Sequence, residues 1–217
     1  KWGHNDIVAA ATSGANGIVI PKVESADIIR ITEKILVENG APDDMGIWCM
    51  IETPFGVLNA EVLARASQRV VGFVMGTSDL AKDAHAAHTR ERLPMLYSLS
   101  HCLLVARAYG LAILDGVHLD LSDDAGFKHS CKQGLELGFD GRTLIHPKTI
   151  DVANEVYAPS ADEVDWSNRI IKAFADAQDE GKGVVVVEGK LVENLHVEDA
   201  KRTVALAGAI KEMEGAI

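Results

Sequence analysis

Short, nearly continuous hydrophobic runs alternate along this chain with longer segments in which hydrophobic residues recur every three or four positions. The short runs are typical of parallel strands that are buried on both faces, and the longer segments are typical of amphipathic helices. The pattern predicts strands at 17–23, 47–52, 70–79, 112–118 and 141–145. It predicts helices at 7–13, 26–39, 56–67, 93–109 and 124–137.

Repeated strand–helix units with short connections predict an α/β fold with a parallel sheet and right-handed crossovers. Five strands permit either an open doubly wound sheet or strands 4–8 of a (β/α)8 TIM barrel. No strand is followed by the G-x-G-x-x-G turn of a dinucleotide fold. The barrel is favoured because polar residues follow consecutive strands and would converge on one mouth. These residues are Glu24, Glu52, Asp79, His118 and His146.

The pattern changes after Pro159, which predicts a division into residues 1–159 and 160–217. The second part reads as a helix to about residue 179, a hairpin over 184–192 and a helix over 197–212. The Ser-Ala-Asp-Glu sequence at 160–163 matches a capping box, which marks a helix start. So small an extension cannot hold a core alone, and we expect it to pack on the barrel or on a neighbouring subunit.

Charge and cysteine content limit the classes of partner and compartment. The 217 residues carry a formal net charge of −11, which disfavours nucleic acid and anionic membranes as partners. Cys49, Cys102 and Cys131 lack metal-ligand spacing, and we expect buried free thiols. The sequence shows no hydrophobic stretch of membrane-spanning length and no signal peptide, so we expect a cytoplasmic protein.

Glu52 and Asp79 are the leading candidates for chemistry, because each follows a hydrophobic run at the edge where such folds place active sites. Two carboxylates on neighbouring strands suit Mg²⁺. Gly76, Thr77 and Ser78 precede Asp79, and their amides are suited to hold a carboxylate or phosphate. The alternative is that both acids are solvated loop residues.

Other charged groups admit two readings each. Lys22 and Glu24 either contribute to the site or form a surface ion pair. His85, His88 and Arg90 either bind an anionic substrate or belong to a solvated loop.

Histidines at strand ends are also candidates. His118 follows a strand, whereas His146 precedes a proline, a position where histidine often fixes the loop by hydrogen bonding. The sequence contains no Ser-His-Asp arrangement and no nucleophile elbow.

An ordered series of motifs resembles the citrate lyase β-subunit-like family of HpcH/HpaI aldolases, and within it the L-malyl-CoA/β-methylmalyl-CoA lyases. The resemblance covers nearly the whole chain. It rests on Pro-Lys-Val-Glu at 21–24, Ile-Glu-Thr-Pro at 51–54, Gly-Val-Leu-Asn at 56–59, Gly-Thr-Ser-Asp-Leu at 76–80, the polar segment 81–94 and Ile-His-Pro at 145–147.

The resemblance implies a (β/α)8 barrel with a C-terminal extension and a Mg²⁺ ion, or Mn²⁺, held by Glu52 and Asp79. The metal would chelate the α-keto acid or the 2-hydroxy group of the substrate. The implied substrate-binding residues are Lys22, Pro54, Gly76, Thr77 and Ser78, and the amides around 76–79 would hold the glyoxylate carboxylate.

The implied reaction is reversible carbon–carbon cleavage of L-malyl-CoA or β-methylmalyl-CoA to glyoxylate and acetyl-CoA or propionyl-CoA. Family members use an acid of the C-terminal extension in a neighbouring subunit's site, which falls on Glu193. The enzyme would then be a homo-oligomer, a trimer or hexamer. Rival readings are a citramalyl-CoA lyase, a malyl-CoA thioesterase and a non-catalytic subunit that binds CoA thioesters.

This chain departs from the family pattern in two places. The family's first three βα units, with a catalytic arginine, have no counterpart here, so we expect the chain to belong to a longer protein. The family's C-terminal aspartate is replaced by a glutamate in the segment Gly-Lys-Leu-Val-Glu at 189–193, with Glu188 and Asp199 nearby.

Overall fold

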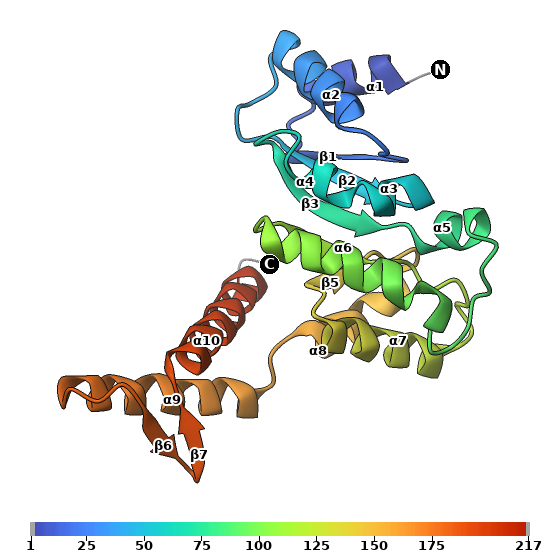
Figure 1. The fold of residues 1–217 in the computed structure, drawn as a ribbon. Helices are drawn as coiled ribbons and strands as arrows, with labels where there is room; N and C mark the ends of the chain where they lie inside the picture. The colour runs from blue at the N-terminus through green and yellow to red at the C-terminus, as the bar shows by residue number, and fades with distance from the viewer. Residues whose placement is uncertain (1–2, 216–217) are drawn as a thin grey trace. The chain divides into compact units, whose positions relative to one another are not determined.

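The computed structural model describes residues 3–215 (Figure 1). The chain divides into two compact units, of which the first ends at Ala153 and the second begins at Asn154. This division falls a few residues before Pro159, where the sequence pattern changes. Each unit is described by itself.

The first unit alternates strands and helices along the chain (Figure 1). Its strands are β1 (Gly17–Ile20), β2 (Gly46–Ile51), β3 (Val70–Met75), β4 (Ala112–Asp115) and β5 (Gly141–Arg142). Its helices are α1 (Gly3–Ala11), α2 (Ala26–Glu38), α3 (Pro54–Leu58), α4 (Ala60–Ala64), α5 (Thr77–Asp83), α6 (Leu96–Ala108) and α7 (Asp124–Leu137), with short 3₁₀ turns η1 (Leu93–Met95) and η2 (Pro147–Thr149). Helix α8 (Ile150–Tyr157) crosses the boundary between the units.

The five strands form one parallel sheet in the order β1-β2-β3-β4-β5. Strands that follow one another in space as in sequence are typical of a barrel segment, whereas a doubly wound sheet reverses its order at a switch point. The predicted α/β class is therefore confirmed. Within residues 3–215 the sheet is not closed, because β1 and β5 each pair with one neighbour only.

One face of the sheet carries the core of this unit. Side chains at paired positions of neighbouring strands point to the same side of the sheet. One such row consists of Ile20, Cys49, Phe73 and Ile113, and its members on β2, β3 and β4 are fully buried. Helix α6 packs against β3 and β4. The opposite face is more open and lines a hollow of about 350 Å³ with Val19, Trp48, Met50, Val74 and Leu114.

The second unit joins two long helices and a small hairpin. Helix α9 (Ala161–Asp179) begins with the predicted capping box, in which Ser160 and Glu163 exchange hydrogen bonds. Strands β6 (Val185–Val187) and β7 (Lys190–Val192) are antiparallel, and α10 (Asn194–Gly215) follows. A small core holds these elements together, so the expectation that the extension could not hold a core of its own is wrong. This core is formed by Ile170, Phe174, Val192, Val197 and Ala200.

Three predicted strands are shorter in the structure: β1 ends at Ile20, β4 at Asp115 and β5 at Arg142. Two further differences lie at junctions between a strand and a helix. The helix predicted over 56–67 is interrupted at Asn59, whose side-chain amide donates a hydrogen bond to the carbonyl of Glu24 at 2.8 Å. The strand predicted to end at Asp79 ends at Met75, and Asp79 lies in the first turn of α5. Both differences arise where a helix begins directly beside the sheet edge.

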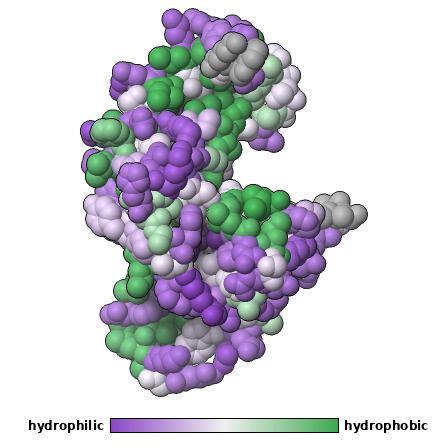
Figure 2. Space-filling model, turned by 90° about the vertical axis from the view of Figure 1, so that its right-hand side faces the viewer, coloured by the Kyte–Doolittle hydropathy of each residue, from purple (hydrophilic) through white to green (hydrophobic). Residues whose placement is uncertain are grey.

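Hydrophobic residues also reach the surface of the first unit. Val19, Ile31, Phe55 and Leu58 are at least half exposed. Green atoms are accordingly visible among the purple ones in the upper part of Figure 2. No helix within residues 3–215 is both long enough and hydrophobic enough to cross a membrane.

Candidate metal site and adjoining pocket

Glu52 is a buried carboxylate at the C-terminal end of β2. Its residue is only 6% exposed, and its Oε1 accepts a hydrogen bond from the backbone N–H of Lys22 at 2.8 Å. Gly76 makes room for it, since a Cβ atom at residue 76 would lie 2.4 Å from the Glu52 Cβ and 2.9 Å from its Oε2. Two neighbouring strands therefore fix the position of this carboxylate.

Asp79 lies beside Glu52 and is more exposed. Burial is the main cause that raises the pKa of Glu52, and the charge and hydrogen bonding of Asp79 raise it further, while Lys22 acts in the opposite direction. Two carboxyl groups close enough to influence each other in this way form the predicted pair. The predicted site is thus assembled from the ends of β2 and β3.

Lys22 contacts both acids. Its Nζ lies 3.3 Å from Asp79 Oδ1, and its backbone N–H binds Glu52. Its backbone has a φ of 50°, the left-handed conformation that non-glycine residues rarely adopt. Burial lowers the pKa of Lys22, but its hydrogen bond to Asp79 and the charges of the nearby carboxylates outweigh that effect and raise the pKa overall. Lys22 is therefore part of the acidic site, and its ion pair is with Asp79 rather than with Glu24.

The Glu-Thr-Pro segment after β2 begins α3 without an intervening loop. Thr53 caps the helix by accepting the N–H of Gly56 at 3.1 Å, and Pro54 occupies the first turn. Asn59 then binds the carbonyl of Glu24. These contacts hold the chain after β1 against the chain after β2, which brings the Lys22 N–H to Glu52.

The residues before Asp79 form the start of α5. The N–H of Gly76 is taken by the carbonyl of Ile51 at 2.9 Å, so it is not free to bind a ligand. Thr77 and Ser78 open the helix, where N–H groups have no carbonyl partner within the helix. The buried Oγ of Ser78 has no hydrogen-bond partner among residues 3–215.

The side-chain oxygens at this site suit Mg²⁺ better than a metal ion that takes all of its ligands from the protein. Residues 3–215 contain no group of three or more His, Cys, Asp or Glu side chains placed to hold a metal ion. Mg²⁺ is commonly held by one or two carboxylates together with water and substrate oxygens. Glu52 and Asp79, with the unpaired Ser78 hydroxyl close in sequence, match that requirement.

A second charged cluster lies at the end of β4. Asp115 is fully buried, and Nη1 of Arg92 donates to its two carboxylate oxygens at 2.8 and 2.7 Å. Nη2 of Arg142 is 3.8 Å from the same carboxylate. Gly116 follows and lies against Thr77, since a Cβ there would be 2.3 Å from Thr77 Oγ1. The cluster thus adjoins the start of α5.

Arg92, Asp115 and Arg142 were not among the predicted site residues. Asp115 lies inside the hydrophobic run predicted as a strand over 112–118. A charged residue within such a run is the sequence signal that could have identified Asp115 as a candidate. Arg92 lies at the end of a polar loop and has a left-handed backbone with φ 51°. The local sequence pattern therefore does not predict that it pairs with Asp115.

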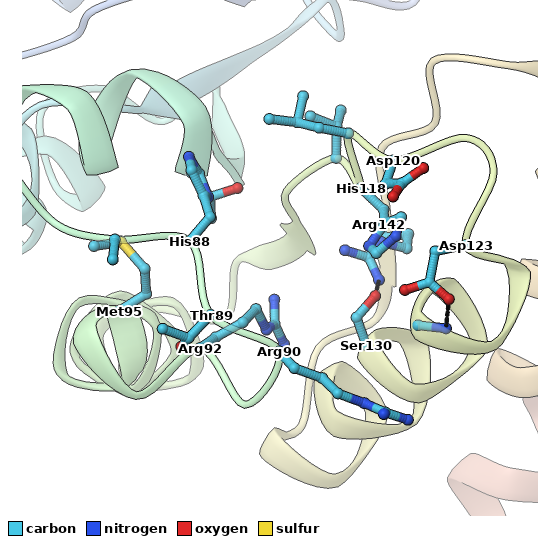
Figure 3. Close-up of a pocket in the computed structure, with 15 residues that line it drawn as sticks. His88, Thr89, Arg90, Arg92, Met95, His118, Asp120, Asp123, Ser130 and Arg142 are labelled. Carbon is cyan, nitrogen blue, oxygen red and sulfur yellow. Dashed lines mark hydrogen bonds between the residues drawn. The ribbon is translucent and has the colours of Figure 1, made fainter.

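The predicted histidines and Arg90 divide between two roles. His88, Arg90 and His118 line a pocket of about 330 Å³ beside the buried cluster (Figure 3). His146 instead accepts the N–H of Lys148 at 3.1 Å through Nδ1, which confirms the loop-fixing alternative.

Glu193 lies in the second unit, immediately before α10. Its backbone N–H donates to Nδ1 of His196 at 3.0 Å, and its residue is partly exposed. Nearby Glu188 pairs with Arg169. A catalytic role for Glu193 stays a prediction.

Comparison with known proteins identifies the family. Residues 1–147 match the family model described as HpcH/HpaI aldolase/citrate lyase. The chain is a member of this family. Its (β/α) sheet and its acidic site both lie within the matched residues.

Several members of the HpcH/HpaI family are similar to this chain over most of its length. A (3S)-malyl-CoA thioesterase of Cereibacter sphaeroides is 45% identical over 97% of this chain and 71% of its own. The β subunit of citrate lyase from Escherichia coli is 33% identical over 95% and 70%, respectively. The mitochondrial citramalyl-CoA lyase of Homo sapiens is 31% identical over 91% and 62%.

Solved structures of the family agree with the fold. The protein CitE from Mycobacterium tuberculosis, crystallised with magnesium, acetoacetate and coenzyme A, superposes with a TM-score of 0.75, 27% identity and coverage of 94% of this chain and 73% of that one. A citrate lyase from Burkholderia xenovorans gives a TM-score of 0.82 at 17% identity, over 97% of this chain and 70% of that one, which supports the fold alone.

Proposed function

We propose that this chain forms the metal-binding part of a Mg²⁺-dependent carbon–carbon lyase. Its substrate would be L-malyl-CoA or β-methylmalyl-CoA, cleaved reversibly to glyoxylate and acetyl-CoA or propionyl-CoA. The observation that carries the proposal is the buried Glu52 beside Asp79, both contacted by Lys22. Related proteins of the family include a citramalyl-CoA lyase and a protein crystallised with magnesium and coenzyme A.

The chemistry breaks one carbon–carbon bond and involves two proton transfers, one from the hydroxyl group to a base and one from an acid to the enolate carbon, so that no proton is gained or lost overall. The carbon–carbon bond between the hydroxyl-bearing carbon and the carbon next to the thioester breaks, and the hydroxyl proton is lost as glyoxylate forms. The electron pair remains on the thioester enolate, which a proton converts to acetyl-CoA. A bound Mg²⁺ supplies a Lewis acid that stabilises negative charge on the glyoxylate oxygen.

The chain's own residues hold and orient the substrate in this proposal. Glu52 and Asp79 hold the metal, with Glu52 fixed by the Lys22 N–H. The N–H groups of Thr77 and Ser78 and the Ser78 hydroxyl receive the glyoxylate carboxylate beside them. Lys22 and Pro54 border the same edge. Glu193 would handle the enolate proton from a neighbouring subunit of a homo-oligomer.

A malyl-CoA thioesterase is the second candidate, because a relative that is 45% identical carries that name. In that reaction water adds to the thioester, the carbon–sulfur bond breaks, and malate and free CoA leave. The two outcomes share the metal site and differ in which bond is cleaved.

The experiment measures glyoxylate and free CoA released from L-malyl-CoA by the full-length protein that carries this chain, with and without Mg²⁺. We expect metal-dependent glyoxylate together with acetyl-CoA. Free CoA and malate without glyoxylate would establish the thioesterase instead. No product in either channel would contradict both and leave a subunit that only binds CoA thioesters.

Matched variants test the metal pair. Glu52→Gln and Asp79→Asn should each lower kcat/KM at least about a hundredfold, because each removes a ligand of the group that stabilises the transition state. Glu38→Gln and Asp27→Asn replace exposed acids on α2 and should leave activity unchanged. Equal activity in the two sets would contradict the assigned site.

A further inference from the structure

The pocket beside the second charged cluster is a separate cavity of the first unit. It encloses about 330 Å³ between the loop after α5 and the chain after β4. Figure 3 shows His88 and Met95 on one side, His118 and Asp120 on the other, and Arg92 between them. Neither Glu52 nor Asp79 lines it, and Thr77 forms the wall on the side of α5.

The charges at its base do not balance. The Arg92 side chain is 13% exposed and the Arg142 side chain 2%, and both face the single, fully buried carboxylate of Asp115. Two guanidinium groups and one carboxylate leave a net positive charge in a region with little water. Asp120 and Asp123, which also line the pocket, offset part of this charge, and Arg90 adds to it.

Polar groups at the base also lack partners. Nη2 of Arg92 and Nε2 of His118 are buried and have no hydrogen-bond partner among residues 3–215. Burial and, to a smaller extent, the neighbouring Arg142 lower the pKa of His118, although Asp123 and Asp120 act in the opposite direction, and the lower pKa favours the neutral imidazole. Arg142, by contrast, uses its remaining donors on Ser130 and on the carbonyl of Gly116.

Two acids on the same side of the pocket as Arg142 and His118, Asp120 and Asp123, limit the charge that the pocket can accept (Figure 3). Asp120 accepts hydrogen bonds from the N–H and Oγ of Ser122 at 2.8 and 2.6 Å, which lower its pKa and keep it ionised. Asp123 caps α7 through the N–H of Gly126. These carboxylates would repel a polyanion, whereas the base attracts a single anionic group.

We propose that this pocket binds one oxyanion, a carboxylate or a phosphate group of a small molecule, with its charge facing Arg92 and Arg142. Charge-assisted hydrogen bonds from guanidinium to such oxygens are among the strong ones in proteins. The pocket makes no use of the metal pair, so the proposal does not rest on the lyase reaction.

The test is isothermal titration calorimetry of the full-length protein with inorganic phosphate and, separately, with acetate. Protein and buffer are first freed of metal by passage over a chelating resin, and KCl keeps the ionic strength constant. Ala87 is exposed and lines the pocket, so Ala87→Trp fills the cavity without altering the buried ion pairs. Ala84→Trp is the matched control, because Ala84 is exposed and lies outside the pocket.

We expect saturable binding of the anion. Ala87→Trp should weaken this binding about tenfold or more, a loss comparable to that of one charge-assisted hydrogen bond. Ala84→Trp should leave the binding unchanged. Glu52→Gln should also leave it unchanged, which separates this site from the metal pair. Binding of phosphate alone would assign a phosphate ester, and binding of acetate alone a carboxylate. Absence of binding by either anion, or equal binding in Ala87→Trp, would overturn the proposal.

Discussion

Gly76 shows how closely the acidic site is packed at the scale of single residues. Its backbone lies against the side chain of Glu52, in a space where any Cβ would overlap the Cβ of the acid. The acid is therefore held from one side by Gly76 and from the other by the N–H of Lys22. Any Cβ added at residue 76 must therefore displace the side chain of Glu52.

Gly76→Ala should weaken Mg²⁺ binding and lower the free energy of unfolding by roughly 1–3 kcal/mol, the usual cost of overpacking. Urea unfolding and Mg²⁺ titration measure the two effects. Gly3→Ala is the control, because a Cβ at residue 3 would have no neighbour within 4 Å. An unchanged Mg²⁺ affinity in Gly76→Ala would show that the contact does not position Glu52.

The buried cysteines give a second prediction at this scale. Burial raises the pKa of Cys49 and of Cys102 to about 12. At pH 8 only about one thiol in ten thousand is then ionised, so both should resist alkylation in the folded protein. Mass spectrometry after iodoacetamide treatment should find them labelled only in denaturant. Labelling of the native protein at the rate of an exposed thiol would contradict this.

Single residues were predictable where a local signal existed. Glu52 and Asp79 stood out because charged residues rarely follow hydrophobic runs without a reason. The pair of Arg92 and Asp115 was not predictable, because its two residues lie 23 positions apart and one of them is in a loop. Local pattern contains no information on such a pairing.

Elements of this fold meet at the sheet edge with almost no loop between them. Helix α3 begins at Pro54, three residues after β2 ends, and α5 begins at Thr77, two residues after β3 ends. Hydrophobic periodicity predicted these strands and helices but not their junctions. The difference arises because caps such as Thr53 and tertiary contacts such as Asn59 to Glu24 set where each element ends.

The loop that carries Arg92 is attached to β4 by one buried ion pair. Asp115→Asn should lower the free energy of unfolding by about 3–5 kcal/mol, because it leaves two guanidinium groups without their buried partner. Urea denaturation checks this against Asp27→Asn, which removes an exposed pair and should cost at most about 1 kcal/mol. Similar losses in the two variants would mean that the buried pair contributes no more than a surface pair.

At the scale of the whole molecule, three consecutive strand ends bring Lys22, Glu52 and Asp79 to one edge. The sequential strand order was predictable because repeated βα units with right-handed crossovers leave few alternatives.

A mixing experiment tests the proposed homo-oligomer. If Glu193 acts in a neighbouring subunit's site, Glu193→Gln and Glu52→Gln should each be inactive alone. Co-refolded together, they should regain activity, because some sites then combine an intact metal pair with an intact Glu193. Activity is followed as glyoxylate release, with each variant refolded alone as the control. No recovery in a mixed oligomer confirmed by light scattering would contradict action between subunits.

Lys22 supports the two acids by different parts of the same residue. Glu52 is bound by its main chain and Asp79 by its side chain. A mutational scan exchanges side chains only, and it would therefore assign Lys22 to Asp79 and miss its link to Glu52. Lys22→Gly keeps the main-chain donor in a conformation that glycine adopts freely, whereas Lys22→Pro removes that donor. The contact of residue 22 with Glu52 therefore depends on its backbone N–H and not on the lysine side chain.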